Sequence, residues 1–285
     1  MLRRFRLEEP ESVKEVCELL GRFGESAKVY AGGTELLLAM KEGLVQYERL
    51  INIKRLSGLN DIKLENGAVY IGALCTHHQL ETSPVLQQNL PALIKLEENV
   101  ANVRVRQVGT LGGNLCFAEP HADPGTLLMA MGATLIAGKS ASKREIAAED
   151  FFVDAYETCL EADEVLTGIR VPLPAPKSGV AYLKFGYLER PSVGVAVALT
   201  LNGKSVGDIR IAVGCAGPAP KRVGEAEALL KGASVDEATQ NLPKAGAVAG
   251  TAAQAISDLH GSQEYKEHIV GVLLKRAFQS ALSQC

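Results

Sequence analysis

The first 57 residues carry alternating helix and strand patterns. Apolar positions three and four residues apart predict an amphipathic helix over residues 13–20. An apolar run at 28–31 predicts a strand, a glycine turn follows at 32–34, and residues 35–42 carry a second helical pattern that ends at Gly43. Another apolar run lies at 50–53. A strand, a helix and a strand in this order favour a small parallel sheet.

A second lobe is expected over residues 58–176. Residues 68–74 are apolar on both faces, which predicts a buried strand. Pro91 and the apolar spacing behind it predict one helix over residues 91–103, and further strands are expected at 133–137 and 165–171. Three prolines within residues 172–176 disfavour a helix and stiffen the chain, so this segment is interpreted as a linker.

The remainder, residues 177–285, is expected to form a third unit. Residues 181–188, 193–201 and 208–215 predict three consecutive strands, with a hairpin turn at Asn202 and Gly203. Ser234 and Glu237 have the spacing of a capping box, and the residues beyond them predict helices. The pattern therefore predicts an α+β protein with domains at 1–57, 58–176 and 177–285.

Composition and charge exclude several classes of protein. The 285 residues are 47% hydrophobic and carry 30 basic and 33 acidic side chains, a balance typical of a globular protein without a nucleic-acid-binding face. The longest apolar run, residues 127–137, is about half of the roughly 20 residues that span a bilayer. The N-terminus shows neither a signal peptide nor a transit peptide. We therefore expect a cytoplasmic protein.

Cysteine and histidine spacing gives no sign of a metal site in this chain. The six cysteines contain no CxxC pair and the five histidines no HExxH motif, so any metal chemistry is expected in a partner. Neither a catalytic triad nor a carboxylate pair follows from the spacing. Glycine is abundant, with 28 residues that often occur as doublets. These doublets indicate binding by backbone amides.

The first candidate site is a strand, a glycine turn and a helix start. Glycines let the backbone approach an oxyanion closely, and consecutive amides form an anion nest. The motif is neither of the common nucleotide fingerprints, and a purely structural turn is the alternative. Its residues are Val29, Tyr30, Ala31, Gly32, Gly33, Thr34, Glu35 and Leu36.

The second candidate site is the glycine-rich segment at residues 109–114. Its side chains could hold phosphate or ribose oxygens while Gly112 and Gly113 present amides, although a tight structural turn is the alternative. Two such loops together indicate a dinucleotide whose pyrophosphate lies between two lobes. The residues of this site are Thr110, Leu111, Gly112, Gly113 and Asn114.

Three polar residues outside the loops have two interpretations each. Asp123 could accept hydrogen bonds from a ribose or cap the helix that follows it. Lys184 could contact a cofactor or face solvent on an edge strand. His121 could reach a ligand or be solvated. The residues alone leave these alternatives open.

Five segments together resemble a known family. They are AGGTELLL at 31–38, IGALCTHHQLE at 71–81, VRQVGTLGGNLCFAEPHADP at 105–124, FFVDAYETCLEADEVLTGIRVP at 151–172 and KFGYLERPSVGVAVAL at 184–199. Their order and spacing resemble the FAD-binding medium subunit of the molybdenum hydroxylases, which include carbon monoxide dehydrogenase, xanthine dehydrogenase and aldehyde oxidoreductases. The resemblance covers nearly the whole chain.

The resemblance implies a fold and a set of cofactor contacts. The implied fold is a two-lobed FAD-binding fold of the vanillyl-alcohol oxidase type, followed by a C-terminal flavoprotein domain of three strands and three helices. Residues 29–36 and 110–114 match positions on the FAD pyrophosphate. Asp123, Leu166 and Lys184 match further cofactor contacts, and so does Val100. No catalytic residue and no metal ligand is implied in this chain.

The resemblance also implies a role and partners. A small subunit with two [2Fe-2S] clusters would pass electrons from a large molybdopterin subunit to the FAD of this chain, and FAD would deliver them to an external acceptor. A dimer of such heterotrimers is expected. The substrate is chosen by the molybdenum subunit in this family, and NAD, a quinone, ferredoxin and oxygen are all open as acceptors.

The sequence departs from the family pattern at a few positions. Glu35 stands where the family often has Asp, and Gln107 where it often has Asn. The residue that shields the flavin ring in some members falls near Arg190, and Tyr187 is another candidate for this position. The cysteine-rich insertion that carries an extra iron–sulfur cluster in one branch is not seen in the sequence.

Two other functions are open from the sequence. The chain could be a self-contained FAD oxidase, dehydrogenase or reductase of the same fold superfamily, which would need a substrate pocket with its own acid or base. It could also be a module that binds a dinucleotide without redox chemistry. Turnover by the isolated chain and the presence of bound flavin separate these functions from an electron-transfer subunit.

Overall fold

Three parallel strands form the N-terminal lobe of the computed structural model, which describes residues 2–186 and 190–285. β3 (Arg49–Asn52) lies between β1 (Arg6–Glu8) and β2 (Ala27–Tyr30) and is parallel to both. α1 (Val13–Phe23) and the 3-10 turn η1 (Gly24–Ser26) precede β2, and α2 (Leu36–Glu42) connects β2 to β3. The predicted small parallel sheet is confirmed.

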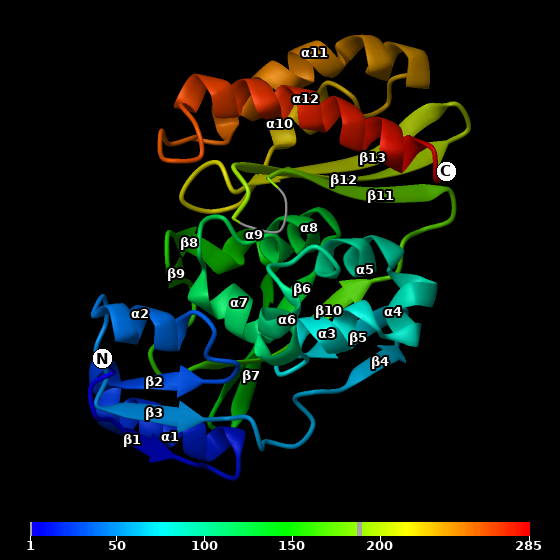
Figure 1. The fold of residues 1–285 in the computed structure, drawn as a ribbon. Helices are drawn as coiled ribbons and strands as arrows, with labels where there is room; N and C mark the ends of the chain where they lie inside the picture. Colours follow the sequence, from blue (N-terminus) through cyan, green and yellow to red (C-terminus); the bar gives the residue numbers. More distant parts are fainter. Residues whose placement is uncertain (1, 187–189) are drawn as a thin grey trace.

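A five-stranded antiparallel sheet forms the centre of the molecule (Figure 1). The order of its strands is β4 (Ile62–Glu65), β5 (Ala68–Gly72), β10 (Val165–Pro172), β6 (Thr134–Lys139) and β7 (Ser142–Ala147). After β7 the chain forms α9 (Ala148–Phe151) and a small hairpin, β8 (Phe152–Asp154) with β9 (Glu157–Thr158). The three strands predicted in this segment are confirmed.

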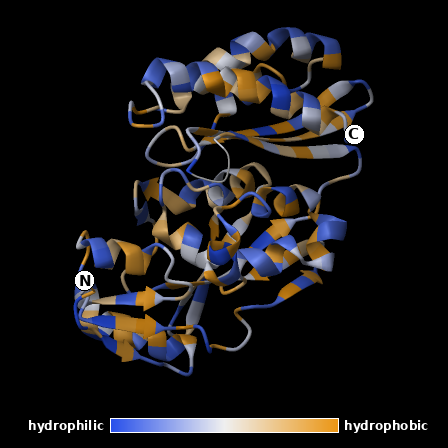
Figure 2. Ribbon diagram, in the orientation of Figure 1, coloured by the Kyte–Doolittle hydropathy of each residue, from blue (hydrophilic) through white to orange (hydrophobic). Residues whose placement is uncertain are grey.

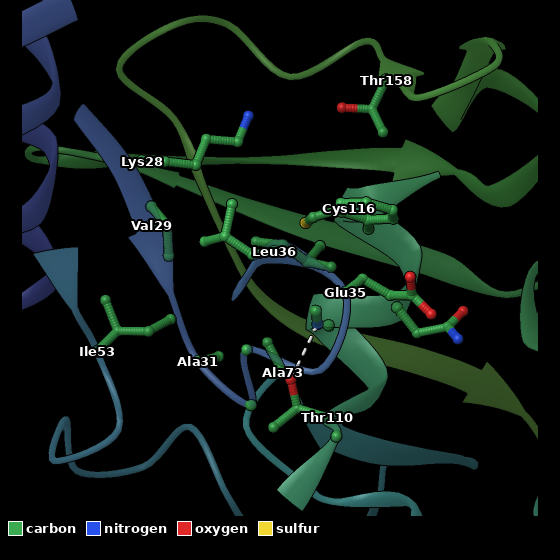
Figure 3. Close-up of a pocket in the computed structure, with 18 of the residues that line it drawn as sticks. Lys28, Val29, Ala31, Glu35, Leu36, Ile53, Ala73, Thr110, Cys116 and Thr158 are labelled. Carbon is green, nitrogen blue, oxygen red and sulfur yellow. Dashed lines mark hydrogen bonds between the residues drawn. The ribbon is translucent and has the colours of Figure 1, made fainter. Parts of the chain in front are cut away.

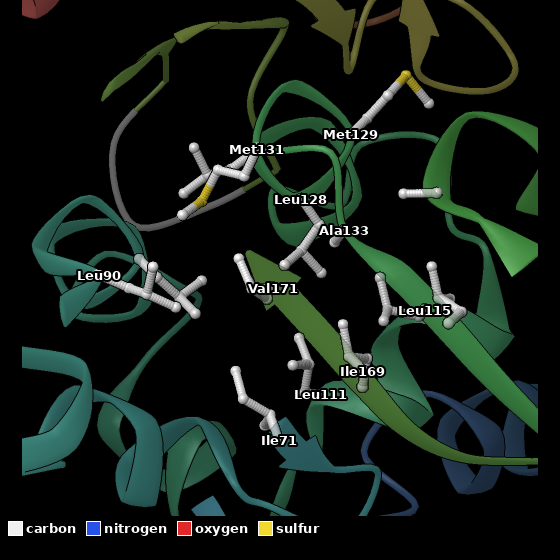
Figure 4. Close-up of a cluster of buried hydrophobic side chains, with 14 of the residues drawn as sticks. Ile71, Leu90, Leu111, Leu115, Leu128, Met129, Met131, Ala133, Ile169 and Val171 are labelled. Carbon is white, nitrogen blue, oxygen red and sulfur yellow. The ribbon is translucent and has the colours of Figure 1, made fainter. Parts of the chain in front are cut away.

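Short helices pack on one face of this sheet. They are α3 (His77–Glu81), α4 (Pro84–Asn89), α5 (Pro91–Glu97), α6 (Val103–Val108), α7 (Leu111–Phe117) and α8 (Pro124–Ala130). The cluster of buried side chains in Figure 4 joins Ile71 and Ile169 of the strands to Leu111, Leu115 and Leu128 of the helices. Burial of such side chains is the main stabilising contribution to this lobe.

The single helix predicted over residues 91–103 is wrong. α5 ends at Glu97, Ala101 adopts a left-handed φ of 45°, and α6 begins at Val103. Asn102 caps α6, because its side chain accepts hydrogen bonds from the amides of Arg104 and Val105. The apolar spacing continues across the break between α5 and α6, and the Asn102 cap is the residue that marks this break.

The C-terminal segment folds into an antiparallel sheet with helices on one side (Figure 1). Its strands are β11 (Ser178–Phe185), β12 (Val193–Asn202), β13 (Ser205–Gly214) and β14 (Lys221–Arg222), in that order. The predicted three strands and their hairpin are confirmed, and the two-residue β14 adds a fourth. α10 (Gly224–Ala228), α11 (Val235–Ala252) and α12 (Gln263–Leu282) follow, and the predicted capping box starts α11.

Both faces of β12 are buried, which explains its uninterrupted apolar sequence. Val195, Val197 and Leu199 belong to the core formed with α11 and α12, whereas Ala196 lies in the central core, on the face that α8 covers. Figure 2 shows apolar residues along β12 and along the middle of α12. No helix in the described parts of the chain is long and apolar enough to cross a bilayer.

Candidate cofactor-binding site

The first glycine-rich loop, residues 31–35, links the end of β2 to the start of α2. Gly33 lies in the left-handed region at φ 73°, and a Cβ there would lie 2.4 Å from the Tyr30 ring. The five consecutive backbone N–H groups of residues 32–36 donate no hydrogen bond to another described residue. Consecutive amides without an internal acceptor are suited to hold an anion.

The second glycine-rich loop starts α7, and its amides are already engaged. Thr110 caps the helix, because its Oγ1 accepts a hydrogen bond from the Gly113 amide at 3.0 Å. The amides of Leu111 and Gly112 donate to backbone carbonyls that follow β5, both at 2.9 Å. The expectation that Gly112 and Gly113 present free amides is therefore wrong. This loop therefore contributes side chains to the site, and its amides hold the loop in place.

The two loops touch. A Cβ built on Gly32 would lie 2.3 Å from the carbonyl oxygen of Val108 and 2.8 Å from the Cα of Gly109. No Cβ fits at that distance from backbone atoms, so only glycine at position 32 permits this approach. The first loop is thus held against the residues that lead into the second.

A cavity of about 430 Å³ opens between these loops, and its volume lies in the usual range for small-molecule sites. Figure 3 shows Val29 and Ile53 at the left of it, Ala73 and Thr110 in its lower part, and Cys116 and Thr158 in its upper part. Most of the predicted cofactor contacts line it: Val29, Ala31, Gly32, Gly33, Thr34, Glu35, Leu36, Val100, Thr110, Gly112, Gly113, Asn114 and Leu166. The structure therefore brings both loops, Val100 and Leu166 to one site.

Four predicted contacts do not line the cavity: Tyr30, Leu111, Asp123 and Lys184. The Tyr30 ring packs against Gly33, and Lys54 donates to the Tyr30 hydroxyl at 3.3 Å. Leu111 is fully buried in the central core. Of these, Tyr30 packs directly against a residue that does line the cavity.

Asp123 and Lys184 form an ion pair between the central lobe and β11. Lys184 Nζ lies 2.8 Å from Asp123 Oδ2 and donates to the Asn99 carbonyl at 2.8 Å, and the Tyr182 hydroxyl donates to Asp123 Oδ1 at 2.6 Å. Asp123 precedes α8 without capping it through its side chain. Burial raises the pKa of Asp123, and the Lys184 charge opposes that shift. Neither sequence interpretation of Asp123 predicted this pairing.

Sequence reasoning missed several segments of the cavity wall. Residues 73–74, 105, 116–117, 156–158, 160–162 and 164–165 line the cavity, and so does His77. His77 is 2% exposed, and its Nδ1 lies 2.6 Å from Oε2 of the fully buried Glu97. The only sequence signal for His77 was its place within IGALCTHHQLE, a segment quoted for the family resemblance.

Charged side chains gather beside the first loop. Arg190 lies 3.2 Å from Glu35 Oε2 and 3.5 Å from Glu119 Oε1, and so joins a residue of the cavity wall to the loop after α7. His121 lies 3.1 Å from Glu119 Oε1 and 3.3 Å from Asp258 Oδ2. The Glu119 hydrogen bond, with Asp258, raises the pKa of His121 despite its partial burial. The other candidate for a ring-covering side chain, Tyr187, lies outside the described residues.

These features fit a dinucleotide. The open amides of residues 32–36 suit a pyrophosphate, and the buried Oδ1 of Asn114 lacks a hydrogen-bond partner among the described residues. The walls near Val29 and Leu166 are apolar, as ring systems require. The arrangement can bind and orient such a ligand.

Two family models together span nearly the whole chain. The FAD binding domain in molybdopterin dehydrogenase matches residues 3–174, which is more than half of the chain, and the CO dehydrogenase flavoprotein C-terminal domain matches residues 189–281. The chain belongs to the FAD-binding medium subunits of the molybdenum hydroxylases. This family makes it an FAD-binding subunit of an oxidoreductase, as the sequence resemblance implied.

Individual relatives agree with the family along their full length. The carbon monoxide dehydrogenase medium chain of Hydrogenophaga pseudoflava is 37% identical over 99% of this chain and 98% of its own. The nicotine 6-hydroxylase medium subunit of Paenarthrobacter nicotinovorans is 31% identical over 97% of this chain and 96% of its own.

Solved structures match this medium subunit over its whole length. A structure of carbon monoxide dehydrogenase from Hydrogenophaga pseudoflava, in a form that lacks the Mo-pyranopterin moiety of its molybdenum cofactor, superposes with a TM-score of 0.96 at 35% identity. That match covers 100% of this chain and 99% of the other. Quinoline 2-oxidoreductase from Pseudomonas putida 86 superposes with a TM-score of 0.91 at 29% identity, over 100% and 99% of the two chains.

Proposed function

We propose that the open amides of residues 32–36 hold the pyrophosphate of FAD. The observation that carries this proposal is that these amides, at the wall of a cavity of about 430 Å³, have no acceptor in the part of the chain that the structure describes. Gly33 supports it, because its φ of 73° turns the backbone where a side chain would obstruct the loop. Backbone donors of this kind bind phosphate without a lysine or arginine.

The other predicted contacts take two roles in this proposal. Val100, Thr110, Asn114 and Leu166 line the cavity and contact the cofactor, with Asn114 Oδ1 accepting a hydrogen bond that none of the described residues supplies. Tyr30, which packs against Gly33, holds the lining in place. The Asp123–Lys184 pair fixes the central lobe against β11.

The chain's task within the enzyme is electron transfer. Bound FAD would accept electrons from [2Fe-2S] clusters of a small subunit and release them to an external acceptor, while a large molybdopterin subunit oxidises the substrate. The medium chains of carbon monoxide dehydrogenase and nicotine 6-hydroxylase support this division, because similar medium chains serve different substrates. This chain then binds and orients the flavin and excludes water from it.

The finer expectations on fold and assembly belong to the same proposal. The two N-terminal lobes, 1–57 and 58–176, form an FAD-binding fold of the vanillyl-alcohol oxidase type, and 177–285 is the C-terminal flavoprotein domain. The end of β10 at Pro172 and the start of β11 at Ser178 support the second boundary. The complex is a dimer of heterotrimers in the cytoplasm.

An absorption spectrum of the protein purified from its native source tests this function. Flavin and iron–sulfur bands, with two companion subunits identified in the same preparation, are the expected result. Flavin in a lone chain that turns over an organic donor would instead support a self-contained enzyme. A chain that stays colourless after incubation with FAD would contradict the proposed site.

A further inference from the structure

His77 occupies the junction of the two glycine-rich loops. Its backbone amide donates to the Gly109 carbonyl at 3.0 Å, and Thr76 caps α3 beside it through a capping box. A Cβ built on Gly109 would lie 3.3 Å from His77 Cδ2 and 3.5 Å from Thr34 Oγ1. The Cδ2 edge of the ring, which carries Nε2, therefore faces the point where the loops meet.

Glu97 holds the opposite edge of the same ring. Glu97 is fully buried, its Oε2 lies 2.6 Å from His77 Nδ1, and its Oε1 has no hydrogen-bond partner among the described residues. Burying a carboxylate without full compensation is costly, so this arrangement calls for a cation nearby. An ionised Glu97 carboxylate can only accept a hydrogen bond, so the proton of the neutral His77 ring stays on Nδ1. The other ring nitrogen, Nε2, is then available toward the cavity.

The cavity wall offers little other positive charge to a phosphate. Its acidic side chains are Glu35, Glu157, Glu161 and Glu164, and its basic side chain is the exposed Lys28. Lys184 does not line the cavity and is engaged by the Asn99 carbonyl and by Asp123, whose carboxylate also interacts electrostatically with His77. On α6, Arg106 is paired with Glu81 at 2.8 Å. Among the described residues of the wall, His77 is the buried group that can gain a positive charge.

We propose that His77 is a positioning residue for the FAD pyrophosphate, and that it takes up a proton when FAD binds. Nδ1–H donates to Glu97, and the added proton on Nε2 is donated to a phosphate oxygen. The proton comes from solvent, and no covalent bond of FAD changes. A hydrogen bond between two charged groups is stronger than a neutral one. This inference rests on the proposed FAD site.

The chain contains a matched control on the same helix. His78 Nδ1 lies 2.7 Å from Glu81 Oε1, nearly the same geometry as the His77 pair. The His78 side chain is 41% exposed, and it does not line the cavity. A substitution at His78 therefore removes a histidine–glutamate pair from α3 without touching the cofactor site.

Calorimetric titration of FAD into the FAD-free full chain tests the proposal. Repeating the titration in phosphate and in Tris buffer counts the protons taken up, because the two buffers differ in ionisation enthalpy. The wild-type chain and His78→Gln should bind FAD with proton uptake. His77→Gln should bind FAD about tenfold more weakly, the loss expected for one hydrogen bond to a charged group, with no proton uptake.

The outcomes separate the two proposals. If the wild-type chain does not bind FAD, the proposed cofactor site fails. If it binds, and His77→Gln matches His78→Gln in affinity and proton count, the role of His77 is overturned while the site stands. Thermal unfolding of the FAD-free variants shows whether each one folds. If His77→Gln does not fold, the same titration is made with Glu97→Gln. Reduced proton uptake by this variant supports the proposal, and unchanged uptake contradicts it.

Discussion

The loop at residues 31–35 and the loop at 109–114 each place a glycine pair close to a helix start, yet their backbone amides differ. In the first loop the amides of residues 32–36 have no acceptor among the described residues, whereas those of residues 111–114 all have one. An anion can therefore gain hydrogen bonds from the first loop without breaking any. Glycines permit close packing in both loops, but only the first loop leaves a run of amides without an acceptor among the described residues.

The largest effect is expected at Gly33. Gly33→Val puts a β-branched side chain at φ 73° and against the Tyr30 ring, so the loop must change its conformation. We expect the dissociation constant of FAD to rise on the order of 100-fold, as for a loss of roughly 2.7 kcal/mol. Flavin fluorescence during titration measures it.

Gly43→Val is the matched control for this substitution. Gly43 has φ 78°, lies at the other end of α2, and would place its Cβ with nothing within 4 Å. It introduces the same backbone strain away from the cavity, so FAD affinity should stay unchanged. Equal affinity losses in both variants would mean that strain in α2, and not loss of the amide nest, weakens binding.

The second loop should affect stability more than binding. Gly112→Ala brings a Cβ within 2.6 Å of the Ala73 carbonyl oxygen, a backbone atom that cannot turn away. We expect the free energy of unfolding of the FAD-free chain to fall by about 1–3 kcal/mol in urea denaturation. Gly113→Ala meets only Thr110 Oγ1 and should cost less. Weaker FAD binding by Gly112→Ala at full stability would contradict this distinction.

Asn114 should affect binding more than stability. Its buried Oδ1 has no partner in the described structure, so Asn114→Leu removes an unsatisfied acceptor. We expect FAD affinity to fall about tenfold, while the unfolding free energy of the FAD-free chain stays equal or rises. A variant that loses stability and keeps its FAD affinity would show that Asn114 is structural.

The smallest effect is a pH dependence at His121, beside the first loop. Glu119 and Asp258 raise the pKa of His121 in the folded chain, so protonated His121 stabilises the fold below its usual pKa of about 6.5. This contribution is lost as the pH rises through the higher folded value. His121→Gln should be less stable by under about 1 kcal/mol in acid and equal in base. A constant difference across this range would contradict the assignment.

Local signals predicted the first loop, but not how the second is used. A turn between the strand and the helix could be predicted from the residue types alone, at Gly32, Gly33 and Thr34. The Leu111 and Gly112 amides donate to the Cys75 and Ala73 carbonyls, far away in sequence, and no local pattern reveals these acceptors. The cap at Asn102 was a local signal that the apolar spacing obscured.

Pairings between distant residues were not predictable either. Lys184 and Asp123 were predicted as separate cofactor contacts, but the structure joins them across 61 positions. His77 and Glu97 come from different helices that meet only in the folded chain. Ionisable residues like these are usually solvated, so a single sequence gives no reason to pair them.

Hydrogen exchange of the backbone amides, followed by NMR with and without FAD, tests the central claim most directly. In the FAD-free chain, the amides of residues 32–36 should exchange fast and those of residues 111–114 slowly. FAD should slow exchange at 32–36 by an order of magnitude or more and change 111–114 little. Amides at 32–36 that exchange at the same rate with FAD bound would contradict the claim that this loop holds the pyrophosphate.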